Sequence, residues 1–402
     1  MPIAPSEVMG RTEFIALMAM MFATVAFSMD AMLAAIPDIA DEIADGSVSH
    51  AAWILTSFVA GMGLGTFFAG PLSDAYGRKP IVYVGVIIYI ISAMAAWATS
   101  SLEWILFARF CQGLGAAGPR VVSMAMVRDL FSGREMARII SIAMAIFILV
   151  PAIAPAMGQV IINAFGWRSI FGSFIIFALI LVIWVGTRYN ESLAFVDRRP
   201  LQMGLMLDAV KQLLTHKTVR LSILIQTFML AMLFATLILI QPIYDQIYDR
   251  GETFPFWFGA VALFSGASSL LNAYIVTHFG MYRVITRTLF IQVVIGATVL
   301  ITLVLFPAIS FPLFVFWQFC LFSQAGLTMG NLNAISMEPM GHIAGMAASV
   351  VGSISTLGGA LIASPVSLLL SDTPAPLIIT VLAFGLCAMF LMSRINRQVT
   401  ED

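Results

Sequence analysis

The chain has 402 residues, of which 60% are hydrophobic and only 10% are charged, and its formal net charge is −1. Soluble domains carry about 25% charged residues, so this composition excludes an ordinary globular core and indicates a helical protein that crosses a membrane many times. The three cysteines, Cys111, Cys320 and Cys387, all lie inside apolar runs. They provide no disulfide framework and no metal-ligand spacing, so we expect no metal or organic cofactor.

Twelve apolar runs have the length of a membrane-spanning helix, and we therefore predict an all-α membrane protein with twelve transmembrane helices in two pseudo-symmetric six-helix bundles. The long polar interruption at 188–218 is a predicted cytoplasmic linker with a short surface helix around Leu207 to Leu214, between an N-terminal bundle at 1–187 and a C-terminal bundle at 219–402. The runs lie near 12–37, 51–72, 80–99, 103–127, 137–162, 166–187, 219–243, 256–277, 284–306, 312–336, 344–370 and 374–394.

The placement of charge predicts the orientation of these spans. If the N-terminus is cytoplasmic, most of the 20 Lys and Arg residues fall on cytoplasmic tails, loops or helix ends, and the outer loops are short and acidic. This asymmetry predicts that both termini lie in the cytoplasm. The loops are too short to fold into an enzyme domain or a nucleic-acid-binding module.

A weak internal repeat relates the two predicted bundles. The segment at 70–79, after the second run, is similar to the segment at 273–282, after the eighth, and Arg109-Phe-Cys in the fourth run corresponds to Gln318-Phe-Cys in the tenth. Duplicated six-helix halves place a binding cavity at the midplane between them, open alternately to each side of the membrane. The repeat therefore predicts a transporter.

Two opposite charges lie at matching depths in different apolar runs. Asp30 is about 10 Å from the outer end of the first run, and Arg109 is at a similar depth in the fourth. Charges inside spans are costly and usually functional, so we interpret Asp30 and Arg109 as a proton-coupling pair that faces a central cavity. The alternative is that Asp30 reaches the outer surface and Arg109 only ties helices together.

Other polar side chains are candidates for the substrate cavity. Arg120 returns to nearly the same helix face as Arg109, and Gln112 shares that face. Arg120 could instead extend to the cytoplasmic headgroups, and each amide could instead be an interhelical hydrogen bond. Phe27, one turn from Asp30, is a candidate apolar contact. The predicted cavity residues are Phe27, Gln112, Arg120, Gln226, Asn272, Gln318 and Asn331.

The loop after the second run resembles the signature G-x-L-[SA]-D-x-x-G-R-[KR] of the major facilitator superfamily. The matching residues are Gly70, Leu72, Ser73, Asp74, Gly77, Arg78 and Lys79. In this family the Asp and Arg join an acid at the end of the fourth helix in a charge network, which here would be Asp74, Arg78 and Asp129. The resemblance implies that this network latches the inner gate, while Ala75 replaces the basic residue that is common at that position.

Further motifs are similar to the drug/proton antiporters of the bicyclomycin and chloramphenicol resistance branch (Bcr/CflA). They are the segments Ser28-x-Asp30 to Pro37, in which Met32 and Ala34 replace the usual Tyr and Pro, Val127 to Arg134, and Glu338 to Gly345. The segment Arg109-x-x-Gln112-Gly113 in the fourth run resembles a motif of the whole superfamily, whose Arg is linked to proton transfer. The fifth run resembles the antiporter motif G-x-x-x-G-P-x-x-G-G at Pro155 and Gly158, although Val150, Ala154 and Gln159 depart from it. Small residues there permit close helix packing, and prolines allow a bend.

The resemblance implies a monomeric, proton-coupled secondary transporter of the bacterial inner membrane that exports small hydrophobic or amphipathic compounds. Its expected partners are a small-molecule substrate, protons and the lipid bilayer, with no nucleic acid, no enzymatic activity and no cofactor beyond the proton gradient. One alternative is a dedicated metabolite exporter or a proton symporter for an anionic solute, favoured by Arg109 and Arg120. Another is a non-transporting sensor or membrane enzyme.

Overall fold

The computed structural model describes residues 9–198 and 200–401, and every regular element in these residues is helical. The first eight residues of the predicted N-terminal bundle, one residue of the linker and the last residue of the C-terminal bundle lie outside the described residues. The chain divides into two compact units, one of residues 1–46 and 57–206 and one of residues 47–56 and 207–402. The prediction of an all-α fold is confirmed.

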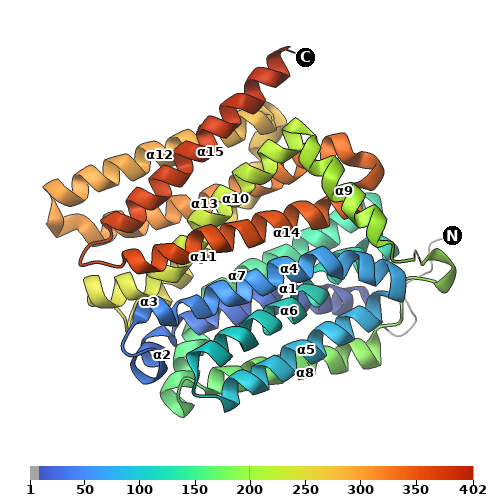
Figure 1. The fold of residues 1–402 in the computed structure, drawn as a ribbon, viewed down its shortest axis with the longest axis horizontal. Coiled ribbons are helices and arrows are strands. Elements are labelled where there is room, and N and C mark those ends of the chain that lie inside the picture. The colour runs from blue at the N-terminus through green and yellow to red at the C-terminus, as the bar shows by residue number, and fades with distance from the viewer. Residues whose placement is uncertain (1–8, 199, 402) are drawn as a thin grey trace. The chain divides into compact units, whose positions relative to one another are not determined.

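The first unit consists mainly of five long helices and most of a sixth, α4, whose first residues belong to the second unit (Figure 1). Its pairs of helices with the most extensive packing are α5 with α6 and α1 with α7. Its elements are α1 (Arg11–Leu33), α2 (Ile36–Ile43), most of α4 (Trp53–Tyr76), α5 (Arg78–Ala98), α6 (Leu102–Leu130), α7 (Gly133–Phe165), α8 (Ser169–Arg188) and the short η1 (Phe195–Asp197).

The second unit repeats this pattern of long helices, and α10 packs against α13, α14 and α15 within it. The short surface helix predicted around Leu207 to Leu214 is confirmed as α9. The elements are α3 (Val48–Ala51), most of α9 (Met203–Thr215), α10 (Lys217–Pro242), η2 (Ile243–Ile247), α11 (Phe254–Phe279), α12 (Met281–Leu305), η3 (Pro307–Ile309), α13 (Ser310–Met337), η4 (Glu338–Ile343), α14 (Ala344–Ala363), η5 (Ser364–Leu369) and α15 (Ala375–Glu401).

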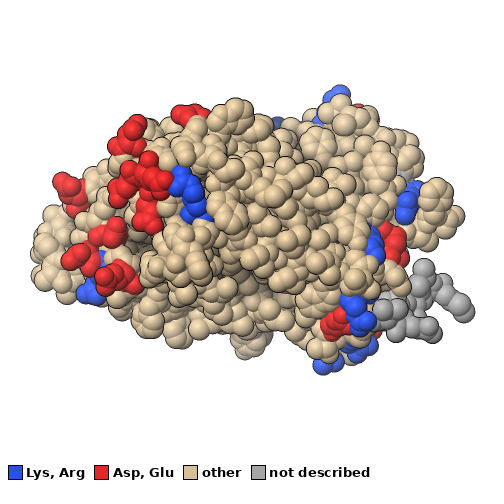
Figure 2. Space-filling view, turned by 90° about the horizontal axis from the view of Figure 1, so that it is seen from below, with Lys and Arg blue, Asp and Glu red and all other residues tan. Residues whose placement is uncertain are grey.

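In the described part of the chain, eleven helical segments are long and apolar enough to cross a membrane. The predicted span at 103–127 coincides with α6, which has 29 residues but is not among the eleven. Arg109 and Arg120, together with several glycines, lower its mean hydropathy. On the face shown in Figure 2, the charged side chains gather mainly in groups toward two sides, and most of the remaining surface carries no charge.

The first predicted span is shorter than expected. We predicted a helix to Pro37, but α1 ends at Leu33 and α2 begins at Ile36, with Pro37 in its first turn. Proline has no backbone N–H and fits the start of a helix better than its interior. Asp30 therefore lies in the last turn of α1, closer to its end than the sequence suggested.

Glycines permit the close packing of α4 on α6 that positions Arg109. A Cβ atom built on Gly113 would lie 1.9 Å from the backbone oxygen of Phe58, and one built on Gly61 would lie 1.9 Å from that of Phe110. No side chain fits at these distances. The two helices are thus in backbone contact at Phe110 and Gly113, one and four residues after Arg109 along α6.

Candidate functional site

The first unit contains a buried polar cluster formed by α1, α5 and α6. Asp30 is 6% exposed, and Arg109 has no exposed surface. Ser28, Tyr89 and Gln112 are also buried. A cationic and an acidic side chain enclosed in an apolar helical bundle are expensive to keep there, so this cluster is the candidate functional site of the unit.

The Arg109 guanidinium has two hydrogen-bond acceptors. It donates to Oε1 of Gln112 over 2.8 Å, one turn along α6, and to the backbone carbonyl of Ser28 on α1 over 2.9 Å. The ring of Phe58 lies 4.5 Å from the guanidinium carbon, and that of Phe174 lies 5.7 Å away. These contacts hold a cation without a carboxylate, since aromatic faces attract cations.

Asp30 and Arg109, predicted as a proton-coupling pair, form no direct ion pair in the described part of the chain, and their coupling stays a prediction. Within residues 9–198, no ion pair joins the two side chains, although Arg109 contacts α1 two residues before Asp30. The prediction of equal depth agrees with this contact. The guanidinium donates to the carbonyl of Ser28, on the helix that carries Asp30, and not to the carboxylate.

Tyr89 is a member of the cluster that the sequence analysis missed. It comes from α5, and its hydroxyl forms a hydrogen bond with the hydroxyl of Ser28. Ser28 also donates to the carbonyl of Thr24 over 2.6 Å. A tyrosine inside an apolar run was the available signal in the sequence, because buried Tyr hydroxyls usually have a partner. In the structure Tyr89 is 1% exposed.

Gly158 of the antiporter-like motif packs directly on the helix turn that carries Asp30. A Cβ atom at Gly158 would lie 2.5 Å from the backbone oxygen of Ala31 and 3.2 Å from its Cα atom. Pro155, one turn earlier in α7, is also buried. The motif therefore fixes how closely α7 approaches α1 beside the acidic side chain.

Two other predicted cavity residues of this unit have different environments. Phe27 is 5% exposed, and its ring lies 5.4 Å from those of both Phe174 and Phe177. It therefore packs α1 against α8 in this structure, and its contact with substrate stays a prediction. Arg120 is partly exposed, and its Nη1 atom lies 3.4 Å from the sulfur of Met62. No carboxylate of the described residues forms an ion pair with Arg120.

The predicted cavity residues of the second unit fall into separate groups. Asn331 on α13 donates to the side-chain oxygen of Asn272 on α11 over 2.9 Å. Gln318 accepts from the hydroxyl of Tyr244 over 2.8 Å. Gln226 is 1% exposed, and its Nε2 atom has no hydrogen-bond partner. The asparagines form an interhelical bond, as the alternative interpretation held, while Gln226 has an unused donor.

A second charge cluster surrounds the turn between α4 and α5 and contains the predicted gating residues. Arg78 donates to both carboxylate oxygens of Asp129, at 2.8 and 3.2 Å, and forms an ion pair with Asp74. Arg78 also donates to Ser73, which in turn donates to the carbonyl of Gly70 over 2.8 Å. The structure thus brings Asp74, Arg78 and Asp129 together.

Glu191 completes this cluster and was not identified from the sequence. Its two carboxylate oxygens accept from the backbone N–H groups of Arg78 and Lys79, each over 2.9 Å. Carboxylates are stabilising at helix N-termini, and this one caps α5 from a distant segment. Gly77 has φ of +107°, and a Cβ atom there would lie 2.8 Å from Glu191, so both conformation and space require glycine.

The clusters contain no arrangement suited to metal binding. No group of three or more His, Cys, Asp or Glu side chains in the described residues could hold a metal ion. The polar cluster of α1, α5 and α6 instead offers an enclosed acid, an enclosed cation and the hydroxyl groups of Ser28 and Tyr89. A long-helix bundle with such a site has the features of a secondary transporter of the membrane, in which ionisable groups inside spans mark ion and substrate pathways.

Comparison with known proteins agrees with this class. A family model described as Major Facilitator Superfamily matches residues 16–363, and the chain belongs to this superfamily. The bicyclomycin resistance protein homolog of Haemophilus influenzae is 30% identical over 369 residues, which are 90% of each chain. The multidrug resistance protein MdtL of Vibrio parahaemolyticus is 35% identical over 145 residues, 36% of each chain. The resemblance inferred from the motifs is confirmed.

The solved structures show the same fold. A D-xylose-proton symporter superposes with a TM-score of 0.73 at 15% identity, over 94% of this chain and 97% of that chain. Membership of the superfamily makes this protein a multi-pass membrane transporter of small molecules and not an enzyme.

Proposed function

We propose that the protein is a proton-coupled antiporter that exports small hydrophobic or amphipathic compounds from bacterial cells by alternating access. In this proposal it is a monomer of the inner membrane with both termini in the cytoplasm, and residues 188–218 link its two bundles. The names of the Haemophilus and Vibrio relatives support drug export. The observation that carries the proposal is the enclosure of Asp30 and Arg109 on the same level of adjacent helices.

Asp30 is the proposed proton carrier. A carboxyl group holds its proton in dry, apolar surroundings and releases it when water or a cation approaches. Arg109 already touches α1 two residues before Asp30. A small rotation of α1 or a change of Arg109 rotamer would exchange the Ser28 carbonyl for the carboxylate. Asp30 is proposed to release its proton in that arrangement.

The remaining cluster members have proposed positioning roles. Gln112 and Tyr89 hold the guanidinium and Ser28 in place. Arg120 and Gln226 each offer an incompletely used donor for substrate. The network of Asp74, Arg78, Asp129 and Gly77, with the packing of Gly70, Pro155 and Gly158, is proposed to set the helix positions during gating. Gln318, Asn272 and Asn331 are proposed to border the substrate path in the second unit.

A second candidate is proton symport of an anionic solute. It is favoured by Arg120, which has partial exposure and no carboxylate partner within the described residues. A guanidinium without a protein anion is suited to a carboxylate or phosphate of a substrate.

Transport in inverted membrane vesicles tests the proposal and separates the two candidates. Export by antiport predicts that a lipophilic compound accumulates in the vesicles when respiration acidifies them and that its addition releases protons from the lumen. Symport of an anion predicts the opposite coupling, in which an outward solute gradient moves protons in the same direction as the solute. Absence of any solute-dependent proton movement with a broad panel would contradict both.

A further inference from the structure

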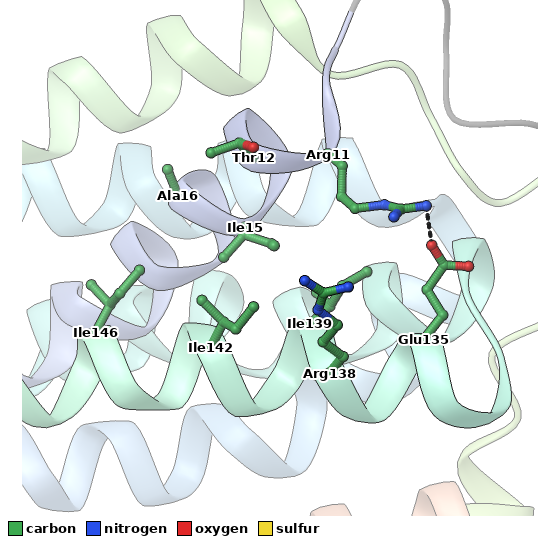
Figure 3. A pocket seen from close by; sticks show the side chains of 9 residues that line it. All are labelled: Arg11, Thr12, Ile15, Ala16, Glu135, Arg138, Ile139, Ile142 and Ile146. Atoms are coloured by element: carbon green, nitrogen blue, oxygen red, sulfur yellow. Dashed lines mark ion pairs between the residues drawn. The ribbon is translucent and has the colours of Figure 1, made fainter.

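A groove between α1 and α7 lies apart from the polar cluster and has no role in the mechanism above. It has a volume of about 550 Å³ and is lined only by residues of the first unit. Its floor is formed by isoleucines of both helices, including Ile15, Ile139 and Ile142, and its rim carries Arg11 and Arg138 (Figure 3). A volume of this size is typical of sites that bind small molecules.

The groove continues into the exposed apolar face of α7. Ile142 and Ile146 are 37% and 40% exposed, and Leu149 and Ile153 follow on the same face with 44% and 51% exposure. These positions recur every three to four residues, so they form one stripe along the helix. In a membrane-spanning helix an exposed apolar stripe contacts acyl chains, and the groove is therefore open to lipid along its length.

The charges at the rim leave one cation unpaired. Arg11 forms an ion pair with Glu135 across the mouth of the groove (Figure 3). Arg138, one turn further along α7, also lines the groove and has no ion-pair partner among the described residues. The three groups together carry a charge of +1, which complements a single phosphate diester.

We propose that this groove binds one anionic phospholipid, whose phosphate contacts Arg138 and Arg11 and one of whose acyl chains lies along the isoleucines. In the orientation proposed above, the site belongs to the cytoplasmic leaflet, where basic pockets between helices bind anionic headgroups. The arrangement needs both parts of the ligand. The phosphate matches the arginines, and the chain replaces water over an apolar floor.

Native mass spectrometry of the full-length protein in detergent tests this proposal. The probes are dioleoylphosphatidylglycerol, dioleoylphosphatidylcholine and glycerol 1-phosphate, which supplies the phosphate without chains. We expect one phosphatidylglycerol to remain bound at collision energies that remove phosphatidylcholine, and no retained glycerol 1-phosphate. Retention of glycerol 1-phosphate to the same extent would show a site for free phosphate and would overturn the proposal.

Variants locate the site. Arg138→Gln should weaken phosphatidylglycerol binding about tenfold, since a charge-assisted contact to phosphate is lost, while Arg138→Lys should retain most of it. Ala16→Leu, which fills the groove with an apolar group, should remove the adduct without changing charge. Arg283→Gln on α12 is the matched control for an exposed arginine and should bind as the unmodified chain does. Unchanged binding in either Arg138→Gln or Ala16→Leu would overturn the proposal, whatever the transport activity.

Discussion

The guanidinium of Arg109 donates to the backbone carbonyl of Ser28 over 2.9 Å, which holds a cation of α6 against the turn of α1 that carries Asp30. A backbone carbonyl is a weaker partner for a cation than a carboxylate. The arrangement therefore leaves the Asp30 carboxylate without an ion pair to Arg109, which the proposed proton-dependent exchange of partners requires.

Replacing Arg109 by lysine tests whether transport needs the planar set of N–H donors of the guanidinium as well as its positive charge. Lysine keeps the positive charge, but its single ammonium cannot match the planar geometry that reaches Gln112, Ser28 and the two aromatic rings. We expect Arg109→Lys to reduce proton-driven transport at least tenfold, a loss of about 1.4 kcal/mol or more, with normal insertion. Initial rates in inverted vesicles, normalised to protein content, measure the effect. Full activity in Arg109→Lys would show that the position needs only a charge.

The two carboxylates that bind Arg78 should contribute unequally. The side chain of Asp129 is 16% exposed and that of Asp74 is 50% exposed. Hydrogen bonds to buried charged groups are worth about 1.5 to 3 kcal/mol, whereas exposed ion pairs contribute at most about 1 kcal/mol. We expect Asp129→Asn to lower the unfolding free energy by about 2 kcal/mol and Asp74→Asn by less than half of that. Thermal unfolding in detergent measures both, and equal losses would contradict the proposed difference.

Gly158→Ala should separate α1 from α7. The added methyl group would lie 2.5 Å from the backbone oxygen of Ala31, so one helix has to shift. Overpacking of this kind costs about 1 to 3 kcal/mol. Gly330→Ala is the control, because nothing lies within 4 Å of its Cβ position and alanine favours helix. A Tm that is unchanged in Gly158→Ala would show that this contact is not tight in the membrane.

The contacts of Glu42, in α2, should make the stability of the first unit depend on pH. Hydrogen bonds from Trp167, over 2.6 Å, and from Arg168 lower the pKa of this carboxyl group. Because the pKa is lower in the folded state, the ionised carboxylate stabilises the fold at pH values above the ordinary glutamate pKa of about 4.3. This stabilisation is lost as the pH falls through the lowered pKa.

The Tm difference between the unmodified chain and Glu42→Gln should therefore be present at pH 7 and shrink below about pH 4. Because Glu42 is largely exposed, we expect a difference of only a few degrees. Thermal unfolding across this pH range measures it. A difference that grows on acidification would have the wrong sign for this contact.

The sequence predicted the helices well because a membrane imposes a length and an apolar composition that can be read directly. The sequence was less successful where packing between helices determines a helix end or the partner of a side chain. Pro37 ended α1 earlier than the apolar run suggested. The matching depths of Asp30 and Arg109 in their spans agree with the contact of Arg109 with α1. Depth alone does not show whether the guanidinium bonds to the carboxylate of Asp30 or to the carbonyl of Ser28, two residues away.

Tyr89 and Glu191 were missed in the sequence for the same physical reason. Glu191 lies in a polar segment and Tyr89 in an apolar helix, and neither had a partner close in sequence. Glu191 caps a helix that begins 113 residues earlier in the chain, and Tyr89 bonds to Ser28, 61 residues away. Such contacts depend on how the helices pack.

Coupling in proteoliposomes tests the role of Asp30 most directly. The purified unmodified chain and Asp30→Asn are compared in two assays, uphill transport driven by a pH gradient and exchange of labelled for unlabelled substrate without a gradient. If Asp30 carries the proton, Asp30→Asn abolishes gradient-driven accumulation and its pH dependence but still performs exchange. Gradient-driven accumulation by Asp30→Asn at the unmodified rate would contradict the account.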